Sequence, residues 1–445
     1  MRNAPGPSPA TVSLGTMNKL HLAAHDGSIE RTLAALSTGV IGIDESGPRG
    51  FTSVMYASFK GHSRVVRILL NKGANATLGD ENGLTALHMS SAAGHLAVMK
   101  LLVKAGADVE TKASDGDVNI GCRPLHLAVE EGQLGAMRVL IEAGANPDSL
   151  RSDGFTSLFI VAGIGNVDAT KILLRARADP LLAHSHSSGG KWVPLDAAAQ
   201  RGHLGVAREL IQEHGIEGCG GTSGGVYALA KAAGTQHLEM VRMLTSAGVV
   251  DTGRALLTAA NYGRESSVRF LLQQQEEWKS SGQGGGYLDT CDPSGRTPML
   301  CSIQAGRSCS PRITRLLVDA GADALTAVRW TKGLDKKGGV ISITPLALVD
   351  LCLRDKKIRG KDATESQLHS LEANRRLLMR VDAVHAVSWL WASDVPSVTH
   401  AAAESTVKTK AISTSLMLML PILRRRTGRP RILLAALSRH SGKPY

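Results

Sequence analysis

The sequence motif closest to a catalytic signature lies in residues 221–225, which read Gly-Thr-Ser-Gly-Gly. This fits the Gly-x-Ser-x-Gly pattern of serine hydrolases, in which a sharp turn from a strand into a helix exposes the serine as a nucleophile. Here the pattern lies inside the glycine-rich run 218–225, between segments with helical periodicity. Such a run is typical of a flexible spacer, and we interpret it as one.

A second candidate is a calcium-binding loop that would begin at Asp115. Asp115, Asp117 and Asn119 occupy the first, third and fifth positions of such a loop. The sixth position, normally a glycine that turns sharply, is Ile120, and the twelfth, normally a bidentate acid, is His126. Because the ion would lack its strongest ligand, we expect a solvated loop.

Two histidine pairs have spacings that a metal ion could use, His21 with His25 and His184 with His186, but neither has a cysteine nearby. The chain also lacks a Gly-x-x-x-x-Gly-Lys phosphate loop, a dinucleotide-binding Gly-x-Gly-x-x-Gly after a strand, and a His-Glu-x-x-His zinc motif. The sequence therefore predicts no catalytic residues, no cofactor and no metal.

The sharpest charge signal is a cluster of arginines near the C-terminus. Its members are Arg424, Arg425, Arg426, Arg429 and Arg431. Such a cluster could be a nuclear localisation signal, a patch that contacts phosphates, or a solvated tail. The apolar runs 416–423 and 432–437 on either side leave another function open, in which the segment lies on an anionic membrane surface.

The positive charge of the chain is concentrated in this tail. The formal net charge is +12, and residues 401–445 supply +8 of it, because nine Lys and Arg stand there against Glu404 alone. The preceding 400 residues are close to neutral. A nucleic-acid-binding domain needs basic residues on its folded body, so the charge distribution argues against one.

The amino-acid composition limits which class of protein this can be. Apolar residues make up 43% of the 445 residues and aromatic residues only 3%, which indicates a core of small aliphatic side chains, as in stacked helices. The six cysteines form no Cys-x-x-Cys pair, which favours a reducing compartment. We find no signal peptide and no apolar run of the ~18 residues that span a membrane, so we expect a soluble protein of the cytoplasm or nucleus.

The elements that position these residues form a repeat, seen most clearly in residues 82–108. A first helix would begin after Thr85 and end at Gly94, and a second, with an apolar face over 96–102, would end at Gly106. One such unit cannot bury its own apolar face, so it has to stack on copies of itself.

Copies recur at intervals near 33 residues that become irregular late in the chain. The positions equivalent to Thr85 are Asn18, Thr52, Arg123, Thr156, Val193, Tyr227, Arg254, Thr297 and Thr344. Motifs that recur with them include Pro124-Leu125-His126, Thr297-Pro298, Gly61-His62, Gly94-His95 and Gly202-His203. In these motifs the chain resembles the ankyrin-repeat family.

The resemblance implies an all-α fold, an ankyrin-repeat solenoid of stacked helix-turn-helix units with hairpin loops and a C-terminal helical cap. It also implies that His21, His88 and His126 tie neighbouring hairpins together through hydrogen bonds. We expect four parts: a disordered segment 1–17, about nine repeats over 18–325 with the later ones degenerate, a degenerate repeat and helical cap over 326–391, and a basic, partly disordered tail 392–445.

The cap is predicted to contain a helix over 364–391, continuous or broken near Asp382. Its apolar side would close the end of the stack, with Trp389 and Trp391 as a lid.

In ankyrin repeats the two residues before the glycine that ends the first helix face the concave groove. Here these residues are Phe59, Lys60, Ala92, Ala93, Glu130, Glu131, Gly163, Ile164, Gln200 and Arg201. An exposed Phe59 beside Lys60 would be a natural anchor for a partner. Insertions at 114–121 and 184–191 lengthen hairpin loops and are further candidates for specificity.

The sequence therefore favours a monomeric, non-enzymatic scaffold or adaptor that binds an unidentified protein partner on its groove and hairpin loops. The alternative is a nuclear regulatory or peripheral membrane ankyrin protein whose basic tail contacts nucleic acid or anionic lipid.

We predict that deleting residues 401–445 abolishes any salt-sensitive binding to nucleic acid or lipid. Binding through this tail would be electrostatic, and its affinity for a duplex would fall with salt with a slope near 0.9 per phosphate neutralised. Affinities of the full and truncated chains, measured over a range of salt concentrations, test this. A truncated chain that keeps the full salt slope would show that the folded body carries a basic patch of its own.

Overall fold

The computed structural model describes most of the chain between Met17 and Ala392. The described residues are 17–114, 121–182, 184–185, 191–219, 225–280, 287–303, 310–325, 328–330, 341–359 and 365–392. They belong to two compact units, one ending at Val249 and the other beginning at Val250.

Within the described residues, the first unit is a stack of seven helix pairs. The first helices of the pairs are α1 (Lys19–Asp26), α3 (Ser53–Lys60), α5 (Ala86–Ala93), α7 (Pro124–Glu130), α9 (Ser157–Ile164), α11 (Pro194–Arg201) and α13 (Val226–Thr235). The second helices are α2 (Ile29–Ser37), α4 (Ser63–Asn71), α6 (Leu96–Lys104), α8 (Leu134–Glu142), α10 (Val167–Arg175), α12 (Leu204–Cys219) and α14 (Leu238–Ser246).

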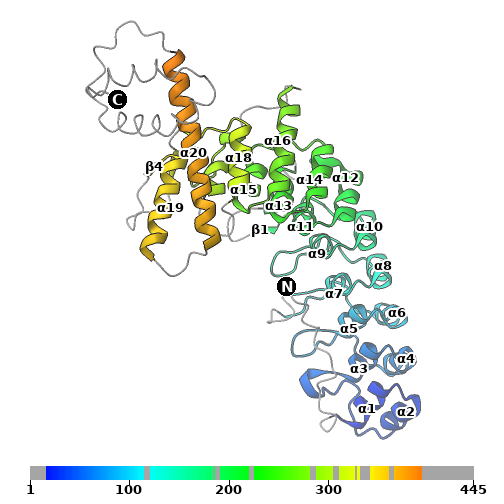
Figure 1. Ribbon diagram of the computed structural model, residues 1–445. Helices are drawn as coiled ribbons and strands as arrows, with labels where there is room; N and C mark the ends of the chain where they lie inside the picture. The colour runs from blue at the N-terminus through cyan, green and yellow to red at the C-terminus, as the bar shows by residue number, and fades with distance from the viewer. Residues whose placement is uncertain are drawn as a thin grey trace, which may run out of the picture. The chain divides into compact units, whose positions relative to one another are not determined.

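Helices of the same kind pack on one another and form two columns (Figure 1). First helices contact each other in sequence from α1 to α13, and second helices do so from α2 to α12. The core between the columns is aliphatic: Val98, Met99 and Leu102 of α6 are fully buried. The structure thus confirms the all-α repeat architecture.

From α1 to α11, the first helices begin directly after the predicted cap positions. The Thr156 hydroxyl accepts the N–H of Phe159 at 3.1 Å and so caps the start of α9. The helix α5 ends at Gly94, whose φ of +74° lies in the left-handed region that favours glycine.

The same glycines fix the distance between repeats. A Cβ added to Gly61 would lie 2.7 Å from the ring of His95 in the next repeat, which leaves no room for any other residue. The ring of His95 in turn donates a hydrogen bond from Nε2 to the carbonyl oxygen of Phe59, at 3.0 Å. The close contact recurs at Gly27 with His62, Gly165 with His203 and Gly202 with His237.

Buried histidines in the first helices join neighbouring hairpins, as the resemblance implies. His88 accepts the N–H of Thr85 at Nδ1, 3.1 Å, and donates from Nε2 to the carbonyl of Cys122, 3.3 Å. His126 makes the same two bonds, to the Arg123 N–H at 3.1 Å and the Ser149 carbonyl at 2.9 Å. Both rings are therefore neutral, and burial lowers the pKa of each to about 4.

The starts of α13 and α15 differ from the sequence expectation. Their N-caps are Gly225 and Gly253, and not the anchor positions Tyr227 and Arg254. For α15 (Arg254–Asn261) the reason is Asp251, a buried residue whose carboxylate accepts the N–H of Ala255 and of Leu256, each at 2.9 Å. Because Asp251 caps this helix from upstream of the expected cap position, Arg254, α15 begins earlier than predicted.

The second unit repeats the two-column arrangement on its own. Its helices after α15 are α16 (Glu265–Ser280), α17 (Pro298–Ile303), α18 (Pro311–Asp319), α19 (Pro345–Arg359) and α20 (Glu365–Ala392). α15, α17 and α19 pack in sequence, as do α16, α18 and α20. The strands β3 (Val328–Trp330) and β4 (Ile341–Ile343) form an antiparallel hairpin.

The C-terminal cap is one continuous helix, α20, without a break at Asp382. Its buried Leu371 and Leu378 lie on the side that packs on α18 and α19, and Arg375 donates to Asp350 of α19 at 2.7 Å. The side chains of Trp389 and Trp391 lie outside the described part of the structure, as do residues 1–16 and 393–445.

The two insertions differ in what the structure describes. At 184–191 the chain forms a short antiparallel hairpin, in which β1 (His184–Ser185) pairs with β2 (Lys191–Trp192). Most of the other insertion, residues 115–120, lies outside the described residues. The helix α12 ends at Cys219, and most of the serine pattern at 221–225 lies outside the described residues, so its interpretation as a spacer stays a prediction. No described helix is long and apolar enough to cross a membrane.

We predict that acid destabilises the first unit through His88 and His126. The unfolded chain takes up protons near the ordinary pKa of 6.5, whereas the folded rings resist protonation down to about pH 4. Their contribution to stability is therefore complete above pH 6.5 and is lost as pH falls toward 4, at about 2 kcal/mol per histidine by pH 4.5.

Urea unfolding at pH 7.5 and pH 4.5 measures this loss. His88→Gln and His126→Gln keep one donor and one acceptor but remove the titration, so the double variant should lose less stability on acidification than the parent. His214→Gln, at an exposed histidine, is the control. An equal loss in parent and double variant would contradict the prediction.

Candidate protein-binding surface

The predicted surface positions lie at the C-terminal ends of the first helices α3, α5, α7, α9 and α11. The second residue of each pair is exposed at Lys60, Glu131, Ile164 and Arg201 and half-buried at Ala93. The first residue is half-buried at Phe59, Ala92, Gly163 and Gln200 and exposed at Glu130. Because the first helices stack side by side, these ends form a row that crosses five repeats (Figure 1).

Phe59 is half-buried, so the expectation of an exposed anchor at this position is wrong. Its carbonyl oxygen accepts the hydrogen bond from His95, which holds this residue against the next repeat. The Lys60 ammonium lies 5.7 Å from the centre of the Phe59 ring and covers part of it. Lys60, and not Phe59, presents the accessible group here.

Ile164 is the exposed apolar side chain in the row, with 46% of its surface accessible. The equivalent positions in the repeats before and after it are Glu131 and Arg201, both exposed. An apolar side chain flanked by charges of opposite sign is the composition expected of a binding anchor with a polar rim.

Glu130 is held in place by Arg151 from the following hairpin, with which it forms an ion pair. The Arg151 guanidinium also donates from Nε to Asp153 at 3.1 Å and lies 5.8 Å from the centre of the Phe155 ring. Phe155 stacks on Phe159 with 4.7 Å between ring centres. The residues packed around the Glu130 carboxyl, whose side chain is 33% accessible, partly desolvate it and raise its pKa, and the charge of Arg151 opposes that shift. Sequence analysis missed this cluster because its members come from different parts of two repeats.

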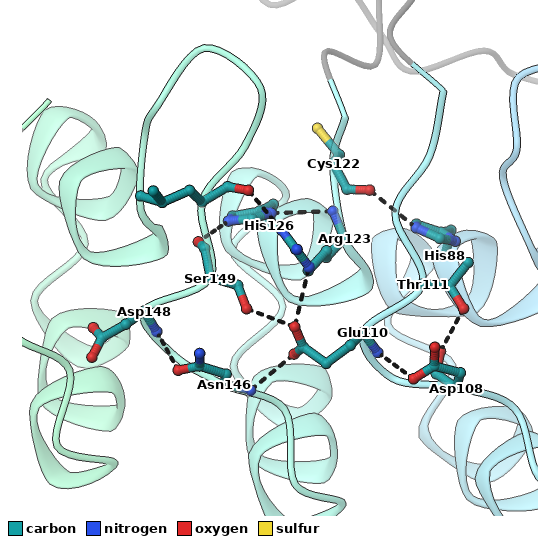
Figure 2. A network of polar contacts seen from close by, with 11 residues as sticks. His88, Asp108, Glu110, Thr111, Cys122, Arg123, His126, Asn146, Asp148 and Ser149 are labelled. Atoms are coloured by element: carbon teal, nitrogen blue, oxygen red, sulfur yellow. Dashed lines mark hydrogen bonds and ion pairs between the residues drawn. The ribbon is translucent and has the colours of Figure 1, made fainter. Parts of the chain in front are cut away.

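Glu110 joins two hairpin loops, as Figure 2 shows. Its carboxylate accepts the backbone N–H of Asn146 at 2.9 Å and the hydroxyl of Ser149 at 2.6 Å. Arg123 lies 3.1 Å from the same carboxylate and donates to the carbonyl of Leu150 at 2.6 Å. These bonds connect repeats three and four, so the loops beside the surface are positioned before any partner binds.

The hairpin formed by β1 and β2 is attached to the next repeat. The ammonium of Lys231, on α13, lies 3.9 Å from the centre of the Trp192 ring. Sequence analysis placed the insertion correctly but did not identify this contact, because Lys231 is 39 residues away and has no motif of its own.

Two further pairs occupy the same place in their repeats and were missed. His25 and Asp26 end α1, and Asn261 and Tyr262 lie at the end of α15 in the second unit. Tyr262 is 58% exposed. The spacing from Asn18 and from Arg254 would have identified both pairs.

Two of the described cysteines, Cys122 and Cys301, are buried. Burial raises the pKa of the Cys122 thiol, and of the Cys301 thiol, to about 11, so neither is a thiolate at neutral pH. Within the part of the chain that the structure describes, no three His, Cys, Asp or Glu side chains gather as metal ligands. The tail arginines from Arg424 to Arg431 lie outside this part, so the functions predicted for them stay predictions.

The comparison with known families agrees with this architecture. The family model described as ankyrin repeats in three copies matches residues 20–113, 78–151, 125–219 and 197–282. No curated protein matches the chain. Since the matches together cover more than half of the sequence, and the helix pairs follow the repeat, the chain belongs to the ankyrin-repeat family.

Proposed function

We propose that this protein is a non-enzymatic adaptor that binds a protein partner along the row of first-helix ends from Lys60 to Arg201. Ankyrin repeats generally mediate protein–protein interactions and are generally not enzymes.

The observation that carries the proposal is the variation at one structural position. Five successive repeats present Lys60, Ala93, Glu131, Ile164 and Arg201 at the same place on a constant backbone. A constant frame with a different side chain in each repeat can specify a partner by its pattern of charge and apolar surface. Ile164 supplies the apolar contact, and Glu131 and Arg201 supply charges of opposite sign.

The surface is also rigid. Glu130 is paired with Arg151, and the loops behind it are joined through Glu110. A surface that is ordered before binding loses less conformational entropy when the partner arrives, which favours affinity.

We predict that the quadruple variant Lys60→Ala, Glu131→Ala, Ile164→Ala and Arg201→Ala lowers partner capture at least about tenfold, which corresponds to ~1.4 kcal/mol. The measurement is quantitative affinity capture with the full chain from an extract of its source cells. The matched control is Arg175→Ala, Arg208→Ala, Gln212→Ala and Glu213→Ala, four exposed residues of the second helices α10 and α12.

Both variants should keep the circular dichroism spectrum and unfolding midpoint of the parent, because every changed side chain is exposed. Proteins that bind the parent and the control but not the quadruple variant support the proposal. If the two variants capture the same proteins in the same amounts, the partner binds elsewhere.

A further inference from the structure

The outer face of the second helices carries charge that the near-neutral composition of the body conceals. In α4 the buried residues are Val65, Val66 and Leu69, and in α6 they are Val98, Met99 and Leu102. The opposite sides of these helices carry Arg64 and Arg67 on α4 and Lys100 and Lys104 on α6, all exposed. Neither helix contains an acidic residue.

Several cations at equivalent places in later repeats have acidic neighbours, although Arg175 of α10 and Arg208 of α12 are exposed like those of α4 and α6. Lys171 of α10 lies 3.2 Å from Glu209, and Arg242 of α14 lies 3.6 Å from Glu239. Arg138 of α8 has Glu142 one turn away on the same helix. Among the described residues, Arg64, Arg67, Lys100 and Lys104 have no acidic partner within 4 Å.

Exposed aliphatic side chains lie among these cations. Leu33 occupies on α2 the place that Arg67 occupies on α4 and Lys100 on α6, and it is 45% exposed. Leu96, at the start of α6, is 39% exposed. The three helices pack side by side, so their outward sides form one continuous face (Figure 1). None of the three contains an aromatic residue, and their one acidic residue is the exposed Glu30 at the start of α2.

We propose that the outer face of α2, α4 and α6 docks on the surface of an anionic lipid bilayer. Clusters of four or more Lys and Arg bind anionic headgroups, and each cation near such a surface changes the partition coefficient about fivefold. Exposed leucines among the cations suit the boundary between headgroups and acyl chains. Nucleic-acid surfaces are more polar, and single strands are bound by aromatic stacking, which this face cannot supply.

Docking through this face leaves the row of first-helix ends accessible, because the two lie on different helix columns. A chain bound in this way could hold a protein partner next to the membrane. The lipid proposal does not depend on the protein-binding proposal, since the two use different residues.

Co-sedimentation of the full chain with lipid vesicles tests the proposal. The vesicles are phosphatidylcholine alone or phosphatidylcholine with phosphatidylserine. To lower the net charge of residues 401–445 from +8 to +3, all chains carry serine in place of Arg424, Arg425, Arg426, Arg429 and Arg431. The face variant is Arg67→Glu, Lys100→Glu and Lys104→Glu, and the control, Lys19→Glu, Lys60→Glu and Arg201→Glu, changes the net charge equally on the first-helix column.

The parent and the control should bind the phosphatidylserine vesicles and not those of phosphatidylcholine alone, with binding that weakens as salt rises. The face variant should bind at least about 100-fold more weakly than the parent. A milder face variant carries Arg67→Gln, Lys100→Gln and Lys104→Gln, which remove the positive charges without adding negative ones. It should also bind more weakly than the control, with a smaller loss, and it takes the place of the glutamate variant if that variant does not fold. Leu33→Ser should weaken the binding that persists at high salt.

Equal binding of the face variant and the control would overturn the proposal. So would a parent that binds duplex DNA or polyglutamate but not the phosphatidylserine vesicles, because the face would then serve a nucleic acid or an acidic protein.

Discussion

The stack depends on a contact, repeated in most of the first unit, between the glycine after a first helix and a side chain of the next repeat. At Gly27, Gly61, Gly165 and Gly202 that side chain is a histidine whose ring occupies the space of a Cβ. Where its Nε2 also donates to a carbonyl two residues before the glycine, as His95 does to Phe59, successive repeats are locked in one register. Glycine is required twice over, for its positive φ and for this close approach.

This register places a row of variable side chains on the first helices and a charged face on the second helices. The carbonyl oxygens of Phe59 and Gly163 accept hydrogen bonds from the histidines of the next repeat. The residue that follows each of them, Lys60 or Ile164, is exposed, and its type differs from repeat to repeat. The second helices bury one side in the core and expose the other, which in α4 and α6 is basic. One constraint on the backbone thus places a variable row on one helix column and a charged face on the other.

Features set by local spacing could be predicted from the sequence. The repeat and the glycine helix ends follow from residues near each other in the chain. The bonds of His88 and His126 to the next hairpin were expected only from the resemblance to the ankyrin-repeat family, because their acceptors, Cys122 and Ser149, are distant in sequence. The partial burial of Phe59 could not be read from its place before Gly61, and the start of α15 depends on Asp251, which lies upstream of the expected cap. The Arg151 cluster and the Glu110 network join side chains that only stacking brings together.

A protein partner that binds the first-helix ends of the first unit would protect their backbone amides from solvent. Amide hydrogen exchange of the full chain, with and without a captured partner, measures this protection. We expect added protection to be confined to the ends of α3, α5, α7, α9 and α11 and the hairpin loops beside them. Added protection confined to the second helices α4 to α12, or to residues beyond Val250, would contradict it.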